Sequence, residues 1–281
     1  MNILKSFISN YFIAFCGFGL LLFTEKKIGS DINPLLIILM VWGIGIMYNL
    51  DPYINSIKNL LSKNSNLNNN QTGFASILFV LLLGLFLFFG LIKIMTVLSL
   101  FILLIATTLG ILYQLPIVII RENHFSLKNI PYLKVPLIAL VWTIITLIIP
   151  LIEVNKMNGE NYLFITERFL FIFAVAIPFD IRDYEKDKKK GIYTYPVIWN
   201  NRVSKLISIV SIFGFLFCVY LNKKAIMPIS LSLYFTGLYA IIFILRSSTK
   251  RNKTFFTFGV DGVLLAPIGF YWIILCMLSL R

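Results

Sequence analysis

Residues 162–197 read YLFITERFLFIFAVAIPFDIRDYEKDKKKGIYTYPV, and this stretch holds the two features that decide the fold. Its first half is apolar over the length of a helix, and its second half changes abruptly to Asp, Lys and Arg. A helix of about 20 residues is needed to cross the roughly 30 Å of hydrocarbon in a bilayer. The stretch therefore predicts a membrane-spanning helix that ends in a charged segment on one side of the membrane.

Similar apolar runs fill most of the remaining chain. Of the 281 residues, 59% are hydrophobic and 13% are charged, whereas a soluble domain carries about 25% charged residues. Only helices and closed barrels satisfy their backbone hydrogen bonds in hydrocarbon, and these runs lack the alternation of barrel strands. We predict an all-α, polytopic membrane protein with about nine transmembrane helices. The predicted spans are residues 9–24, 32–50, 72–92, 95–113, 131–152, 162–179, 204–221, 226–246 and 259–279.

The basic residues set the predicted orientation. Seventeen of the 25 Lys and Arg residues fall in the N-terminal segment and in the even-numbered connections between spans. Because Lys and Arg concentrate on the cytoplasmic side, we expect the N-terminus inside and the C-terminus outside. The long connections at residues 51–71, 114–130 and 180–203 are then cytoplasmic. No soluble domain is visible, so residues 1–281 are expected to form a single transmembrane domain.

Composition also argues against several classes of function. The net charge of +13 comes from basic residues between apolar runs, not from a basic groove interleaved with aromatics, so no nucleic-acid partner is expected. Cys16, Cys218 and Cys276 all lie inside apolar runs, and no CxxC motif occurs. Neither disulfides nor a cysteine metal site is therefore expected.

The charged segment after residue 179 carries the clearest chemical signal. Asp180, Asp183 and Asp187 stand at i, i+3 and i+7, positions that share one face of a helix. Their mutual repulsion is relieved by a cation, and Mg²⁺ prefers oxygen ligands and phosphate groups. Arg182 and Lys186 add positive charge that can contact phosphate oxygens. The residues alone are equally compatible with a metal and phosphate site and with an ordinary charged loop.

Residues 180–197, DIRDYEKDKKKGIYTYPV, resemble the second Asp-rich motif of the UbiA-type intramembrane prenyltransferases. A weaker similarity, to the family's loop between helices 4 and 5, involves Tyr113, Lys128 and Lys134. The resemblance implies nine helices around a central cavity that opens toward the cytoplasmic side. It also implies Asp-rich motifs at the cytoplasmic ends of helices 2 and 6, and the motif found here follows the predicted sixth span.

The same resemblance implies an activity. Family members transfer a prenyl group from a polyprenyl diphosphate to an acceptor, often an aromatic ring, within the membrane lipid. Mg²⁺ is the implied cofactor, bridging the diphosphate and the carboxylates of Asp180, Asp183 and Asp187. The implied phosphate-contacting residues are Lys128, Lys134, Arg182 and Lys186, with Tyr113 in the substrate site. The acceptor is not indicated by any motif.

The first Asp-rich motif departs from the family pattern N-x-x-x-D-x-x-x-D. If Asp51 takes the first Asp position, Asn55 stands where the second carboxylate is expected, and Asn49 lies close by. These three residues are the candidates for the opposite half of the substrate site, with Asp51 as a metal ligand. Asp51 followed by Pro52 is also a common start of a helix, which is an alternative role for this carboxylate.

Asp261 lies inside the last predicted span, where an ionisable residue is costly and by default functional. We expect it to line the same cavity; a structural, hydrogen-bonded carboxyl group is the alternative. Two other functions remain open for the whole chain. One is a non-catalytic isoprenoid-binding or partner-binding protein on the same scaffold, which the altered first motif favours. The other is a transporter that uses Asp261, which the absence of an obvious pair of broken helices disfavours.

Overall fold

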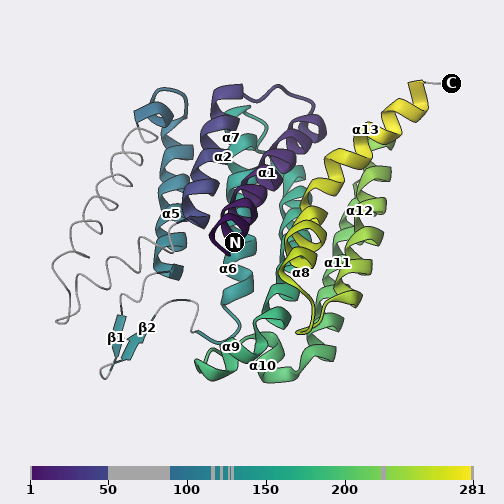
Figure 1. The fold of residues 1–281 in the computed structure, drawn as a ribbon. Helices are drawn as coiled ribbons and strands as arrows, with labels where there is room; N and C mark the ends of the chain where they lie inside the picture. Colours follow the sequence, from purple (N-terminus) through teal and green to yellow (C-terminus); the bar gives the residue numbers. More distant parts are fainter. Residues whose placement is uncertain are drawn as a thin grey trace.

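A computed structural model describes residues 2–49, 89–114, 118–120, 123–125, 127, 130–222 and 226–279. Over these residues the chain forms a bundle of long helices, with two short helices and a small hairpin gathered at one end (Figure 1). The elements in chain order are α1 (Asn2–Ile28), α2 (Pro34–Tyr48), α5 (Val97–Gln114), β1 (Val118–Ile120), β2 (Asn123–Phe125), α6 (Lys134–Thr143), η2 (Ile144–Ile148), α7 (Ile149–Glu153), η3 (Gly159–Asn161), α8 (Tyr162–Arg182), α9 (Tyr184–Lys189), α10 (Tyr195–Trp199), α11 (Asn201–Leu221), α12 (Met227–Arg246), η4 (Phe255–Val260), η5 (Asp261–Leu265) and α13 (Ala266–Ser279).

The helical membrane fold is confirmed. Among the described residues, five helical stretches are long and apolar enough to cross a membrane. They are Lys134–Glu153, Tyr162–Arg182, Asn201–Leu221, Met227–Arg246 and Phe255–Ser279. Two shorter apolar helices, Pro34–Tyr48 and Val97–Tyr113, match the predicted second and fourth spans. Most of the predicted span 72–92 lies outside the described residues, so the count of nine stays a prediction.

One element was not expected from the sequence. The predicted connection 114–130 contains the antiparallel pair β1–β2, in which Val118 lies opposite Phe125. The hairpin lies at the same end of the bundle as α9 and α10 (Figure 1). The bundle itself is helical, so the hairpin modifies a connection and leaves the predicted fold class intact.

The outer face of α11 shows that lipid is the surrounding solvent. Leu206, Val210, Phe213, Phe217 and Tyr220 are all more than half exposed. Their spacing of three or four residues places them on one side of the helix. The opposite side of α11, with Ser208 and Phe215, is buried against the bundle. A water-soluble protein does not expose an apolar stripe of this length, whereas a helix in a bilayer does.

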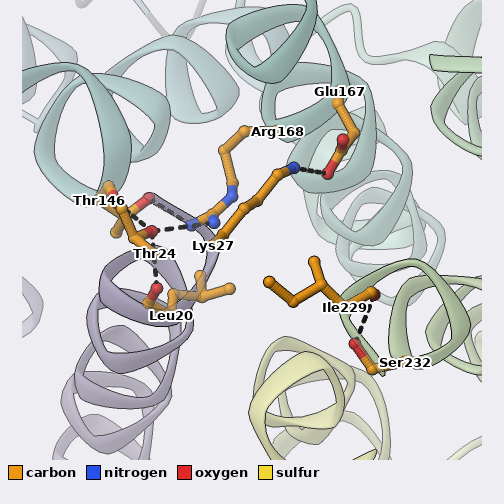
Figure 2. A network of polar contacts seen from close by, with 8 residues as sticks. All are labelled: Leu20, Thr24, Lys27, Thr146, Glu167, Arg168, Ile229 and Ser232. Atoms are coloured by element: carbon orange, nitrogen blue, oxygen red, sulfur yellow. Dashed lines mark hydrogen bonds and ion pairs between the residues drawn. The ribbon is translucent and has the colours of Figure 1, made fainter. Parts of the chain in front are cut away.

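A buried polar network lies near the start of α8, far along the bundle from α9 and α10. Lys27 forms an ion pair with Glu167 (Figure 2). Lys27 Nζ lies 2.6 Å from Glu167 Oε1, and both side chains are about 3% exposed. Beside them, the Arg168 guanidinium donates to Thr24 Oγ1 at 3.0 Å and to Thr146 Oγ1 at 3.1 Å. The network therefore ties α1, η2 and α8 together.

A proline explains part of this arrangement. Pro150 has no N–H to donate to the carbonyl of Thr146, four residues earlier in the same span. That carbonyl accepts a hydrogen bond from the Thr24 hydroxyl at 2.8 Å instead. In a membrane such a group must find a partner within the protein, so the proline and the threonine hydroxyl support each other.

Candidate functional site

The aspartate segment does not form one continuous helix, contrary to the expectation from its spacing. α8 ends at Arg182 and α9 begins at Tyr184, with Asp183 between them at φ −88° and ψ 7°. The backbone N–H of Asp183 still donates to Phe179 O at 3.0 Å. The break separates Asp183 from the face that the spacing predicted, while Asp180 and Asp187 still approach each other.

Lys134 joins these two aspartates. Its Nζ atom lies 2.7 Å from Asp180 Oδ1 and 3.0 Å from Asp187 Oδ2. Asp180 is 1% exposed and Asp187 is 4% exposed, so both carboxylates are withdrawn from water. Among the described residues, Asp180 Oδ2 has no hydrogen-bond partner. Two buried carboxylates thus share one ammonium group, and one carboxylate oxygen is left to accept a further donor or a cation.

The end of α9 holds Asp187 in place. Gly191 has φ +66°, a conformation that glycine adopts without strain. The Gly191 N–H donates to Lys188 O at 3.2 Å, and the Ile192 N–H donates back to Asp187 O at 2.9 Å. These two bonds form a Schellman motif, which ends the helix one turn after the carboxylate. Gly191 therefore stops the helix.

Asp183 is paired with its neighbour. The guanidinium of Arg182 donates to Asp183 Oδ2 at 2.8 Å and to Oδ1 at 3.1 Å. The same guanidinium lies over the rings of Phe179 and Phe256, at 5.1 and 5.5 Å from their centroids. Partial burial by itself raises the pKa of Asp183, but the hydrogen bonds and charge of Arg182 outweigh it and the pKa is lowered. Asp183 is therefore ionised and accepts from Arg182.

An apolar cavity of about 530 Å³ reaches Tyr113, a residue within electrostatic range of the aspartate cluster. Its walls come from α2, α5, α6 and η2, and Tyr113 at the end of α5 belongs to the lining. Tyr113 lies within electrostatic range of Lys134 and Asp180. The volume falls within the roughly 300–1,000 Å³ of small-molecule sites. The arrangement is an apolar chamber with a charged group at one end.

Two aromatic residues in this wall were not singled out from the sequence. Trp142 Nε1 donates to Tyr48 Oη at 3.1 Å, and their rings meet edge to face with centroids 6.3 Å apart. Both residues line the cavity. Among 43 aromatic residues, sequence pattern offers no way to separate cavity-lining rings from lipid-facing ones.

The donor set suits a divalent cation that also binds a ligand. Among the described residues, no three His, Cys, Asp or Glu side chains form a ready metal site. Asp180 and Asp187 supply two carboxylates, and Asp180 Oδ2 is available. Mg²⁺ is commonly held by one or two carboxylates plus phosphate oxygens and water, not by a complete protein cage. The cluster therefore fits half of such a site, with the other half supplied by a phosphorylated ligand.

The remaining predicted residues are distributed as follows. Asp51, Asn55 and Lys128 lie outside the described residues. Asn49 follows α2 and donates from Nδ2 to Gly45 O at 2.7 Å. Lys186 is exposed on α9. The structure therefore brings together Asp180, Asp187, Lys134 and Tyr113, and it places Arg182 with Asp183 beside them.

Asp261 lies where the last span changes its helical geometry. It follows the π-helical segment η4 and begins the 3₁₀ segment η5, and its carbonyl accepts from Cys16 Sγ at 3.2 Å. Its carboxyl group is within electrostatic range of Arg182 and Tyr48. It does not belong to the lining of the 530 Å³ cavity. Asp261 is thus within electrostatic range of Arg182 and of the cavity-lining Tyr48, but it is not itself part of the lining.

The charged network of Figure 2 is the other feature that sequence reasoning missed. A signal was available, because Glu167 and Arg168 both fall inside the predicted span 162–179. Charged residues at such depth are expected to pair inside the bundle. The pairing partner, Lys27, is 140 positions away and could not be identified from spacing.

Comparison with known proteins gives one family. The model of the UbiA prenyltransferase family matches residues 67–274. No curated protein of known function matches the sequence.

Several solved structures share the fold. A UbiA homologue from Archaeoglobus fulgidus superposes with a TM-score of 0.63 at 13% identity, covering 98% of this chain and 99% of that chain. The same homologue bound to GPP and Mg²⁺ gives 0.62 at 12% identity, covering 96% and 99%. The apo structure of a UbiA homologue from Aeropyrum pernix K1 gives 0.58 at 12% identity, covering 95% and 97%. At these identities the likeness shows the fold.

Proposed function

Because the chain belongs to the UbiA prenyltransferase family, we propose that it transfers a prenyl group from a polyprenyl diphosphate to an acceptor within the membrane, with Mg²⁺ as cofactor. The observation that carries the proposal is the buried pair Asp180 and Asp187 at the charged end of an apolar cavity. A diphosphate ester of a long isoprenoid has the same two parts, a highly charged head and an apolar tail. The Archaeoglobus fulgidus homologue bound to GPP and Mg²⁺ supports this class of ligand.

Each charged residue has a part in binding the head group. Asp180 and Asp187 hold the cation, with Asp51 from the altered first motif as a further ligand. Lys134, Arg182, Lys186 and Lys128 contact the phosphate oxygens. When bound, Mg²⁺ neutralises the charge that develops on the departing diphosphate. Lys134 lies between the two carboxylates that would hold the cation, so its ammonium group is close enough to the proposed site to contact phosphate oxygens.

The proposed reaction needs only two reactants, the prenyl diphosphate and the acceptor. The bond between the allylic carbon and the diphosphate oxygen breaks, and the diphosphate leaves with the electron pair. A nucleophilic atom of the acceptor bonds to the allylic carbon, and the acceptor then loses a proton. The apolar wall keeps water away from the allylic cation. The faces of Tyr48 and Trp142 in that wall can stabilise the cation.

The proposed topology follows the distribution of basic residues. We place the end of the bundle with α9 and α10 in the cytoplasm, because the connection 180–203 is rich in Lys and Arg. The N-terminus is then cytoplasmic and the C-terminus is outside, and residues 1–281 form one transmembrane domain. The prenyl diphosphate enters from the cytoplasmic side, and its prenyl tail lies in the cavity inside the bundle.

A second candidate function is supported by one observation. Asn55 replaces a carboxylate of the first motif, which lowers the negative charge available to a second cation. The alternative protein binds an isoprenoid or a partner on the same scaffold and carries out no chemistry. The retained pair Asp180 and Asp187 favours the enzyme, because Lys134 bonds only one oxygen of each carboxylate and Asp180 Oδ2 is left as an oxygen ligand for a cation.

The experiment that tests the proposal measures binding of geranylgeranyl diphosphate to the purified full-length chain in detergent. We expect binding that requires Mg²⁺, is abolished by EDTA and is lost in Asp187→Asn. Glu185→Gln is the matched control, because Glu185 is an exposed acid on the same short helix. Mg²⁺-dependent binding without transfer to any acceptor in a screen of aromatic and lipid acceptors would favour the non-catalytic alternative. No binding by folded protein would overturn both.

A further inference from the structure

The cavity has a defined direction. Tyr113 is the lining residue that lies within electrostatic range of Asp180, so the charged site opens into this end. At the other end of α5, the Thr96 N–H donates to Glu153 Oε1 at 2.9 Å. Glu153 ends the span that begins at the charged site, so α5 runs from the opposite end of the bundle toward it. A prenyl tail attached to a diphosphate at the aspartates therefore extends from Tyr113 toward Leu100.

One wall of this path contains a glycine. Gly43 lines the cavity on α2, between Leu39 on the far side and Tyr48 on the charged side. At 1.5 Å per helical residue, the wall from Tyr48 to Gly43 is about 8 Å long and the wall from Tyr48 to Leu39 is about 14 Å long. A geranyl tail ends near the level of Gly43, whereas a geranylgeranyl tail has to pass it.

Gly43 is not explained by close packing of helices. Glycines in membrane helices commonly let neighbouring backbones or side chains approach. Gly17, Gly110 and Gly259 fit that pattern, because an added Cβ at each would lie 2.4 to 2.6 Å from a neighbouring side chain. At Gly43 no described atom comes within 4 Å of the position that a Cβ would occupy. Among the described residues, the missing side chain therefore leaves open space in the cavity itself.

We propose that Gly43 sets the length of the prenyl donor, by leaving the tail path open where any larger residue would narrow it. The inference rests on the proposed function and names a substrate class for it, an allylic diphosphate longer than geranyl diphosphate. The effect is steric, since a side chain at residue 43 takes the space of an isoprene unit that lies beyond the length of a geranyl tail. A substitution at residue 43 does not change the diphosphate end of the site, which is more than a helical turn away along α2.

The test compares donors of two lengths in the full-length protein. Binding of geranyl and geranylgeranyl diphosphate is measured with Mg²⁺ for wild type, Gly43→Ala and Gly43→Leu. We expect the preference for the longer donor to fall by about tenfold or more in Gly43→Leu, the scale of discrimination when a pocket loses room for part of an apolar substrate. Gly43→Ala gives a smaller shift in the same direction and keeps the test open if the leucine variant does not fold.

The matched control is Gly269→Leu. Gly269 also has open space around it, but it lies exposed on α13 and does not line the cavity. The control is expected to keep the wild-type ratio of affinities. If wild type shows Mg²⁺-dependent binding and the folded Gly43 variants keep its ratio of affinities, the inference is wrong. Absence of Mg²⁺-dependent binding in wild type would instead refute the proposed function, so the two failures are distinguishable.

Discussion

The ammonium group of Lys134 lies 2.7 Å from the carboxylate of Asp180, a residue 46 positions later on a different span. Asp187 shares the same ammonium at 3.0 Å. The contact joins the first residue of α6 to the last turns of α8 and α9. Lys134 thus supplies the positive charge between the two buried carboxylates that would hold a cation in the proposed enzyme.

The first prediction concerns Asp180. Replacing it with Asn keeps the shape of the side chain but removes a buried charge and the available oxygen Oδ2. We expect prenyl transfer to fall by about 100-fold or more, the scale seen when a group that stabilises transition-state charge is removed. Turnover with geranylgeranyl diphosphate and Mg²⁺ is the measurement. If the exposed control Glu185→Gln loses as much activity, the effect is one of general charge and the assignment of Asp180 is wrong.

The second prediction concerns Lys134. Lys134→Met leaves two buried carboxylates without their cation, and breaking such a cluster costs about 3 to 5 kcal/mol. We expect a lower unfolding temperature in EDTA, with Mg²⁺ restoring more stability in the variant than in wild type. Thermal unfolding in detergent, with and without Mg²⁺, measures both effects. Lys189→Met, which removes an exposed lysine outside the proposed site, should change neither. An equal Mg²⁺ effect in wild type and Lys134→Met would contradict the shared position of ammonium and metal.

The third prediction concerns Asp261. Its carboxyl group lies within electrostatic range of Arg182, which pairs with Asp183. If Asp261 takes part in substrate binding, Asp261→Asn should lower turnover by about tenfold, because an ionisable carboxyl group is lost from a water-poor site. The exposed residue Asp31 provides the control substitution Asp31→Asn. Wild-type turnover in Asp261→Asn would remove Asp261 from the site and leave it a structural role.

The fourth prediction concerns the network of Figure 2. Glu167→Gln leaves Lys27 buried without its counter-charge, so we expect the free energy of unfolding to fall by about 3 to 5 kcal/mol. The double variant Lys27→Met with Glu167→Gln should recover part of the loss, because the ammonium group of Lys27 is no longer buried without its counter-charge, while Arg168 keeps its hydrogen bonds to Thr24 and Thr146. Thermal unfolding of the single and double variants is the measurement, with Lys26→Met as the control from the more exposed pair with Glu25. Additive losses in the double variant would show that the two residues do not stabilise each other.

Much of the architecture was predictable because membrane helices are local. The apolar run at residues 162–179 appears in the structure as part of Tyr162–Arg182, and the run at 226–246 as Met227–Arg246. Helix length and apolarity are properties of consecutive residues, so one sequence shows them. The break at Asp183 was not predictable in the same way, because i, i+3 and i+7 spacing is compatible with a continuous helix. The change to π-helical and 3₁₀-helical geometry in η4 and η5 left no signal in the apolar pattern either.

The sequence alone determined that this chain is a helical membrane protein and that its chemistry lies in the segment after residue 179, because both follow from composition and short-range spacing. Only the tertiary structure decided which charges meet. Lys134 reaches Asp180 and Asp187, and Lys27 reaches Glu167, through helices that are distant in the sequence. The size and lining of the cavity were likewise decided by packing, since open space beside Gly43 depends on where α2, α5 and α6 lie. Such contacts depend on the positions of whole helices, which no local pattern of residues encodes.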